Sequence, residues 1–152
     1  MAATEEAIGA FFAQNRIAVV GVSRKKAHFS RMVFKALRER DYDVVPVNPS
    51  AGEIDSVRAF RTPGEVDPPP GAVLVMTKRP APELLRACLE TRPAALWVYR
   101  AGGSLELPPG AATRLITDEC PLMYLKNAGW IHSLHRRLRS WFGSMPPPTP
   151  AE

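Results

Sequence analysis

The chain has 152 residues, with 20 Lys and Arg against 15 Asp and Glu, and a formal net charge of +5. Its hydrophobic content of 45% and charged content of 23% are typical of globular proteins and exclude extensive disorder. No apolar run approaches the roughly 18 residues of a membrane span, and residues 1–6 do not resemble a secretion signal, so we expect a cytoplasmic protein. The two cysteines, Cys88 and Cys120, form no CxxC pair and predict neither a disulfide framework nor a zinc site.

Short apolar runs rich in β-branched residues alternate along the chain with segments whose apolar residues repeat at helical spacing. The first pattern is typical of strands buried on both faces of a parallel sheet, and the second of amphipathic helices. In chain order, the sequence predicts a helix over 4–14, a strand over 17–22, a helix over 29–40, a strand over 43–47, a weak helical turn over 54–60, a strand over 72–76, a helix over 82–89, strands over 96–99 and 114–117, and a helix over 130–142.

Strands that alternate with helices at this spacing form right-handed βαβ units. We therefore predict an α/β fold, a Rossmann-like, doubly wound, mostly parallel five-stranded sheet with helices on both faces. Residues 1–143 form one domain in this interpretation, and the proline-rich residues 144–152 form a flexible tail. Pro46 indicates that the strand over 43–47 has positions without a ladder hydrogen bond.

The same spacing predicts which side chains are buried. Cys88 lies on the apolar face of its helix, and Leu122, Met123 and Tyr124 are expected in the core. For Cys120, burial as a packing residue is favoured over a reactive thiol near a ligand. The apolar stripe of the helix over 29–40 comprises Phe29, Met32, Val33, Ala36 and Leu37.

The loop after the first predicted strand combines features that bind phosphate. Ligands of open parallel sheets bind beyond the carboxyl ends of the strands, where this loop lies. Gly21 permits a sharp turn, Ser23 supplies a hydroxyl, and the following helix directs free N–H groups at the same place. Arg24, Lys25 and Lys26 add three cations. The pattern favours a phosphate-binding loop over the alternative of a solvated basic loop.

This loop departs from the G-x-G-x-x-G fingerprint of dinucleotide-binding proteins, because Ser23 and Lys26 occupy the second and third glycine positions. The second strand ends in Val47-Asn48-Pro49 and lacks the acidic residue that holds the ribose of NAD. A missing acid and a surplus of cations disfavour NAD. They favour a nucleotide with an additional phosphate on its ribose, either NADP or coenzyme A.

The segment IAVVGVSRKKAHFSRMVFKALRERDYDVVPVNP, residues 17–49, resembles the start of the CoA-binding domain family. Members of this family of small Rossmann-like proteins follow the first strand with V-G-x-S, a basic loop and a second serine, and end the second strand in P-V-N-P. The resemblance extends over residues 7–125 and includes the strand of Trp97 and the segment 118–121. These proteins are in turn similar to the nucleotide-binding domain of the succinyl-CoA ligase α chain.

The resemblance implies that CoA lies across the strand ends, with phosphate on the first loop and the nucleotide against the residues after the second strand. The cofactor-binding residues implied in this way are Gly21, Ser23, Arg24, Lys25, Lys26, Ser30, Asn48 and Pro49. Ser30 has the alternative role of capping the helix. The strand-end rule adds Thr77 and Lys78, whose alternative is an exposed turn. The chain departs from the family pattern at 77–80 and 99–103, where the pantetheine arm of CoA is expected to run.

No nucleophile–base pair, metal-ligand set or pair of carboxylates is evident in the sequence. We therefore expect a non-catalytic protein that holds CoA or an acyl-CoA through the basic loop. The alternatives are a small NADP-binding oxidoreductase and a nucleotide-responsive interaction module. The helix over 130–142 is expected to pack on the sheet or to join a homodimer or a partner chain. His132 and His135 favour a surface role over metal binding, and no nucleic-acid motif is present.

Overall fold

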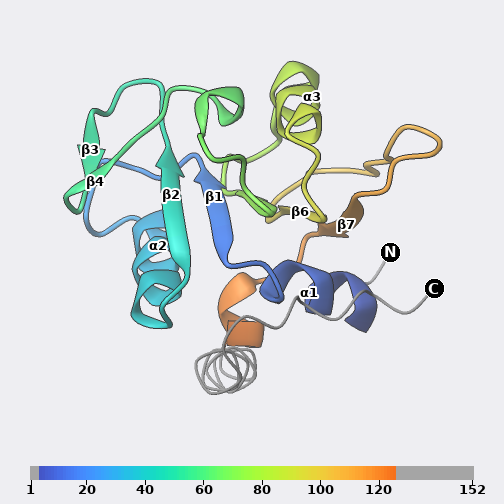
Figure 1. Cartoon of the computed structure of the whole chain (residues 1–152), viewed down its shortest axis with the longest axis horizontal. Helices are drawn as coiled ribbons and strands as arrows, with labels where there is room; N and C mark the ends of the chain where they lie inside the picture. The colour runs from blue at the N-terminus through green and yellow to red at the C-terminus, as the bar shows by residue number, and fades with distance from the viewer. Residues whose placement is uncertain (1–3, 126–152) are drawn as a thin grey trace.

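Five parallel strands form the central sheet of the structure, a computed structural model that describes residues 4–125 (Figure 1). From one edge to the other, the strands are β2 (Asp43–Val47), β1 (Arg16–Val20), β5 (Ala72–Val75), β6 (Ala95–Val98) and β7 (Arg114–Thr117). A separate antiparallel hairpin pairs β3 (Glu53–Ile54) with β4 (Val57–Arg58). The helices are α1 (Glu5–Phe12), α2 (Phe29–Glu39), the 3-10 helix η1 (Pro63–Glu65) and α3 (Pro82–Glu90), and residues 121–125 are helical as well. The prediction of a doubly wound α/β fold is confirmed.

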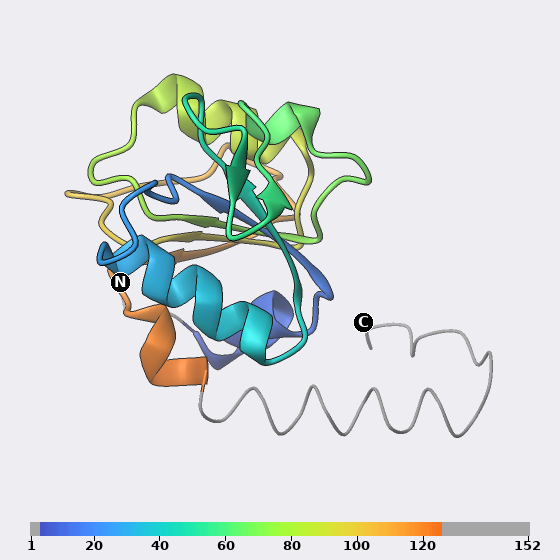
Figure 2. The same ribbon diagram turned by 90° about the vertical axis from the view of Figure 1, so that its left-hand side faces the viewer.

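Helices cover both faces of the sheet, and Figure 2 shows the resulting three layers with the sheet seen edge-on. Helices α1 and α2 pack on one face against Ile17, Val19 and Leu74. Helix α3 packs on the other face against Val20 and Val73, and η1 lies beside α3. Every residue of β5 and β6 is buried. This two-sided burial explains why these strands read as continuous apolar runs and not as an alternating pattern.

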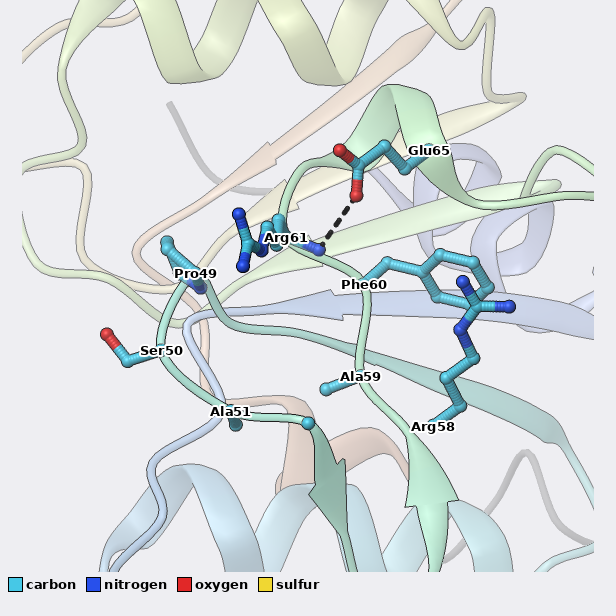
Figure 3. A pocket seen from close by; sticks show the side chains of 9 residues that line it. Pro49, Ser50, Ala51, Arg58, Ala59, Phe60, Arg61 and Glu65 are labelled. Atoms are coloured by element: carbon cyan, nitrogen blue, oxygen red, sulfur yellow. Dashed lines mark hydrogen bonds between the residues drawn. The ribbon is translucent and has the colours of Figure 1, made fainter.

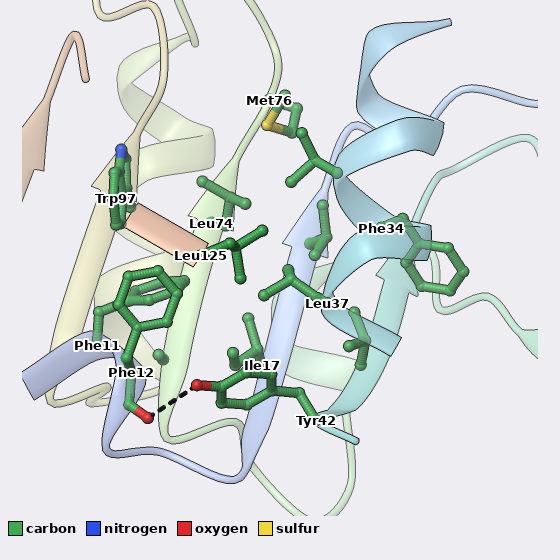
Figure 4. Close-up of a cluster of buried hydrophobic side chains, with 14 of the residues drawn as sticks. Phe11, Phe12, Ile17, Phe34, Leu37, Tyr42, Leu74, Met76, Trp97 and Leu125 are labelled. Atoms are coloured by element: carbon green, nitrogen blue, oxygen red, sulfur yellow. Dashed lines mark hydrogen bonds between the residues drawn. The ribbon is translucent and has the colours of Figure 1, made fainter. Parts of the chain in front are cut away.

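Aromatic rings fill the space between α1 and the sheet (Figure 4). Phe11 and Phe12 meet the fully buried Trp97 edge-on, with ring centroids 5.1 and 5.8 Å away. The hydroxyl of Tyr42 donates a hydrogen bond of 3.3 Å to the Phe12 carbonyl, and burial raises the pKa of Tyr42 to about 12. On the opposite face, Cys88 is fully buried as predicted, and burial raises the pKa of its thiol to about 12.

Strand β2 lies at one edge of the sheet, a position that tolerates a proline such as Pro46. The Pro46 carbonyl faces away from β1 and accepts a hydrogen bond of 3.0 Å from the Phe60 amide. Phe60 then accepts a bond of 2.9 Å from the Asn48 amide, so the segment after β4 covers this edge of the sheet. The missing N–H of Pro46 leaves no gap in the ladder to β1.

Two burial predictions are wrong. Met32 is 54% exposed and Met123 is 71% exposed. The buried face of α2 includes Val33, Phe34 and Leu37, and a helix turns by about 100° per residue, so the residue before Val33 points toward solvent. Phe34, which the predicted stripe omitted, is fully buried.

The weak helical turn predicted over 54–60 is also wrong, because this segment forms the β3–β4 hairpin. Its two-residue turn consists of Asp55 and Ser56, with φ of 49° and 64°. Positive φ at both central positions is the geometry that tight hairpins favour, and Asp tolerates it better than most residues. The predicted helix over 130–142 and the tail over 144–152 lie outside the described residues. Within the described part of the chain, no helix has the length and apolar character needed to cross a bilayer.

Candidate functional site

The crossover direction of the sheet reverses between β1 and β5, which pair with each other. Gly21 follows β1 directly and has a φ of +86°. A Cβ atom on Gly21 would overlap the Thr77 hydroxyl and lie 3.0 Å from the Thr77 amide nitrogen. The structure therefore brings together two of the predicted site residues, Gly21 and Thr77, at the point where ligands of doubly wound sheets bind.

Hydrogen bonds within the chain hold the loop after β1 in a defined shape. The Ser23 amide donates a bond of 2.9 Å to Ser30 Oγ, and the Ser23 hydroxyl accepts one of 3.1 Å from the Lys25 amide. His28, not Ser30, caps α2, because its ring accepts a bond from the Ser30 amide. The Ser30 hydroxyl lies 2.8 Å from His28 Nδ1 and is fully buried. Ser30 therefore shapes the loop from beneath.

Asn48 joins the loop after β1 to the loop after β2. Its side-chain amide donates a bond of 2.8 Å to the Val22 carbonyl, and its side-chain oxygen accepts one of 2.7 Å from the Ser50 amide. A surface depression of about 500 Å³ lies between the two loops, lined by Ser23, Arg24, Lys25, Asn48 and Ser50. Four of these five residues are in the predicted site. Lys26 and Lys78 are exposed near this edge without lining the depression, and Pro49 belongs to a neighbouring one.

The neighbouring depression, of about 610 Å³, shares Ser50 with the first and extends along the segment after β4 (Figure 3). Its lining includes an aromatic ring with a cation over it, since the Arg58 guanidinium carbon lies 4.8 Å from the Phe60 ring centroid. Arg61 adds a second cation, and Glu65 accepts a hydrogen bond from the Arg61 amide. These residues were not among the predicted site residues, because the sequence indicated only a weak helical turn over 54–60 in this segment.

The carboxyl edge of the sheet is rich in cations that lack a carboxylate partner. The exposed Lys and Arg residues there that form no ion pair within residues 4–125 are Arg24, Lys25, Lys26, Arg58, Arg61, Lys78, Arg79 and Arg100. Like charges that share one edge raise the local positive potential and attract anions. The carboxyl edge of the sheet therefore carries a local excess of positive charge.

The two segments that depart from the family pattern contact each other at the tips of β5 and β6. The Arg79 amide donates a bond of 2.8 Å to the Arg100 carbonyl. A Cβ atom on Gly102 would lie 3.2 Å from Arg79 Cδ, so the glycine makes room for the arginine stem. The ring of Tyr99 packs 5.2 Å from that of Phe29 at the start of α2. These contacts join the tips of β5 and β6 to each other and to the start of α2.

The segment after β7 offers polar groups without a metal-binding cluster. The Trp97 indole donates a bond of 2.9 Å to the Glu119 carbonyl, and the Tyr124 hydroxyl donates one of 3.1 Å to the Glu119 carboxylate, which raises the pKa of the Tyr124 phenol. Cys120 is half-buried. Among residues 4–125, no three His, Cys, Asp or Glu side chains are grouped so that they could hold a metal ion.

The fold and the strand-end loops together define a Rossmann-like α/β domain with several cations around its switch point. The chain belongs to the family of CoA binding domains, whose model matches residues 15–126. The resemblance read from the sequence is thereby confirmed.

The chain is also similar to individual proteins. The uncharacterized protein YneT of Bacillus subtilis is 36% identical over 86 residues, which are 56% of this chain and 64% of YneT, so the match spans less than two thirds of that relative. A Thermus thermophilus structure, cell-free ID.343, is 23% identical with a TM-score of 0.69, and the match covers 82% of this chain and 98% of that one. A dinucleotide forming acetyl-coenzyme A synthetase from Ca. Korarchaeum cryptofilum is 18% identical with a TM-score of 0.54, over 59% of this chain and 20% of that one. The two solved structures show the shared fold.

Proposed function

We propose that this protein binds CoA or an acyl-CoA at the carboxyl ends of β1, β2 and β5 and holds it without catalysing a reaction itself. The observation that carries the proposal is the depression between the loops after β1 and β2, rimmed by Ser23, Arg24 and Lys25. The diphosphate of CoA rests on the basic loop at the start of α2, where free N–H groups and the positive end of the helix dipole favour an anion.

The neighbouring depression supports a place for the nucleotide end of the ligand. Its Phe60 ring and the cations Arg58 and Arg61 suit an adenine next to a ribose phosphate. The reactive end of the ligand then runs toward Thr77 and Lys78 at the tip of β5. This path uses both sides of the switch point, as ligands of doubly wound folds do.

Thermal unfolding in the presence of candidate ligands tests the proposal. A ligand that binds the native state alone stabilises it, and a CoA concentration of about 100 times its dissociation constant is expected to raise the unfolding midpoint by roughly 5–10 °C. Acetyl-CoA is expected to act similarly, while pantetheine, which lacks the phosphates, leaves the midpoint unchanged.

The same titration separates the alternative functions. NADP also carries a ribose phosphate, and a midpoint that rises with NADP but not with CoA would replace the proposal with an NADP-binding oxidoreductase. Incubation of the protein with acetyl-CoA tests the absence of catalysis. We expect thioester loss no faster than in buffer, and faster loss would show an activity that the proposal does not include.

A further inference from the structure

Arg31 is a buried arginine in the first turn of α2, directly beneath the loop after β1. The residue is 7% exposed, and its Nη1 donates hydrogen bonds of 3.3 Å to the Ser23 carbonyl and 3.0 Å to the Arg24 carbonyl. Its Nη2 forms an ion pair with Asp55. One side chain therefore contacts both the candidate phosphate loop and the β3–β4 hairpin.

The two carbonyls that Arg31 holds determine where the neighbouring N–H groups point. In a trans peptide the C=O and the N–H point in opposite directions, so a carbonyl drawn inward to Arg31 turns the following N–H outward. The Lys25 N–H turned in this way donates to Ser23 Oγ, whereas the Arg24 N–H has no acceptor within residues 4–125. Arg24 also lines the depression between the two loops. A free N–H at such a turn is the group that anion-binding loops present.

Asp55 reaches Arg31 because the hairpin turn is tight. Asp55 and Ser56 form the two-residue turn between β3 and β4 with positive φ, and the Asp55 carboxylate projects from that turn to the guanidinium. The hairpin is continuous in sequence with the segment after β4, which lines the neighbouring depression. The position of the guanidinium is thus fixed from the side opposite to the loop.

Stability alone explains this arrangement poorly. Removing an arginine and a carboxylate from water has a desolvation cost that buried pairs recover only with complete hydrogen bonding. Arg31 Nε is buried and has no hydrogen-bond partner among the described residues. Apolar side chains of similar size at both positions 31 and 55 would avoid both costs.

We propose that Arg31 is a positioning residue for the anion site: held by Asp55, it turns the peptide groups of the loop after β1 so that the Arg24 N–H faces the ligand. The proposal rests on the proposed function only in the identity of the ligand, since the loop geometry serves any phosphate or diphosphate. Arg31 itself does not touch the ligand.

The test compares Arg31→Met, Arg31→Lys and a matched control, Arg38→Met, with inorganic pyrophosphate and CoA as probes. Arg38 is an exposed cation on the same helix that donates to the Asp55 carbonyl and does not contact the loop. In the wild-type protein, pyrophosphate is expected to shift the amide NMR signal of Arg24. Arg31→Met should lower the affinity of the protein for both probes about tenfold. Arg31→Lys should restore part of the affinity, and Arg38→Met should leave it unchanged.

The results of this comparison support or overturn the positioning role of Arg31. A folded Arg31→Met protein with wild-type pyrophosphate affinity, or an Arg24 amide that pyrophosphate does not shift in the wild type, overturns the positioning role. The wild-type protein could bind pyrophosphate in a way that depends on Arg31 and yet not bind CoA. That result supports the positioning role and contradicts the proposed function. If Arg31→Met does not fold, Asp55→Asn is measured instead. Asp55→Asn is expected to lower the affinity for pyrophosphate about threefold with little change in the unfolding midpoint. An unchanged affinity overturns the proposal.

Discussion

A variant in which Arg24, Lys25 and Lys26 are all replaced by glutamine is expected to bind CoA about 100-fold more weakly than the wild-type protein. All three side chains are exposed and none has a carboxylate partner within residues 4–125, so each is available to a phosphate. Charge-assisted hydrogen bonds contribute about 1.5–3 kcal/mol when fully formed, and exposure reduces that contribution through solvent screening. Isothermal titration calorimetry at an ionic strength of about 0.1 M measures the change.

The control for this variant removes the same net charge from elsewhere on the surface. Lys35, Arg86 and Arg114 are exposed on α2, on α3 and at the start of β7. Replacing these three by glutamine is expected to change CoA affinity less than threefold, because long-range attraction is screened within about 10 Å at moderate salt. Equal losses of CoA affinity in the two variants would mean that the overall charge of the protein, and not the loop, attracts the ligand.

Replacing Trp97 by alanine is expected to lower the free energy of unfolding by about 3–5 kcal/mol. Trp97 is fully buried in the centre of β6 and packs edge-on against Phe11, Phe12 and Tyr124. Its indole N–H also holds the Glu119 carbonyl, so the variant loses a hydrogen bond as well as the ring. Single domains have a total free energy of unfolding of about 5–15 kcal/mol, so this substitution removes a large fraction of it.

Urea denaturation followed by circular dichroism measures this loss. The matched control is Met123→Ala, since Met123 is 71% exposed and its truncation is expected to cost less than about 0.5 kcal/mol. The loss of stability in Trp97→Phe is expected to lie between those of Trp97→Ala and Met123→Ala, because this variant keeps an aromatic ring and removes the indole N–H. A Trp97→Ala protein as stable as the control would contradict the packing described around β6.

The sequence predicts the central sheet well because two-sided burial leaves a strong local signal. Ala72–Val75 and Ala95–Val98 are apolar throughout, and only a strand covered on both faces tolerates that composition. Pro46 indicated positions without a ladder hydrogen bond for an equally local reason, because proline has no N–H. The loop after β1 was found in the same way, from a glycine and three cations next to a strand end.

Features that depend on tertiary contacts were harder to predict. Asp55 and Ser56 lack the Asn-Gly or Asp-Gly signal of a tight hairpin, and the flanking strands have only two residues each. Arg31 carries no motif, and its importance appears only when the carbonyls of the loop and the Asp55 carboxylate surround it. Met32 sits one position away from a buried residue, and small errors in helical phase expose or bury a side chain.

The cofactor assignments of Ser30 and Asn48 illustrate a limit of motif reading. Both residues lie where the motif predicts them, yet their side chains bond to the chain itself: Ser30 supports the Ser23 amide, and Asn48 ties Val22 to Ser50. A motif records that a residue type is required at a position. It does not separate a residue that contacts the ligand from one that shapes the loop around it.

A crystal structure of the protein with CoA tests the central claim most directly. The account predicts the diphosphate of CoA within hydrogen-bond distance of the loop that follows β1, with its oxygens near the Arg24 amide, and the rest of the ligand crossing the tips of β1 and β5. CoA bound at any other surface, with the loop over residues 21–26 left free, would contradict it.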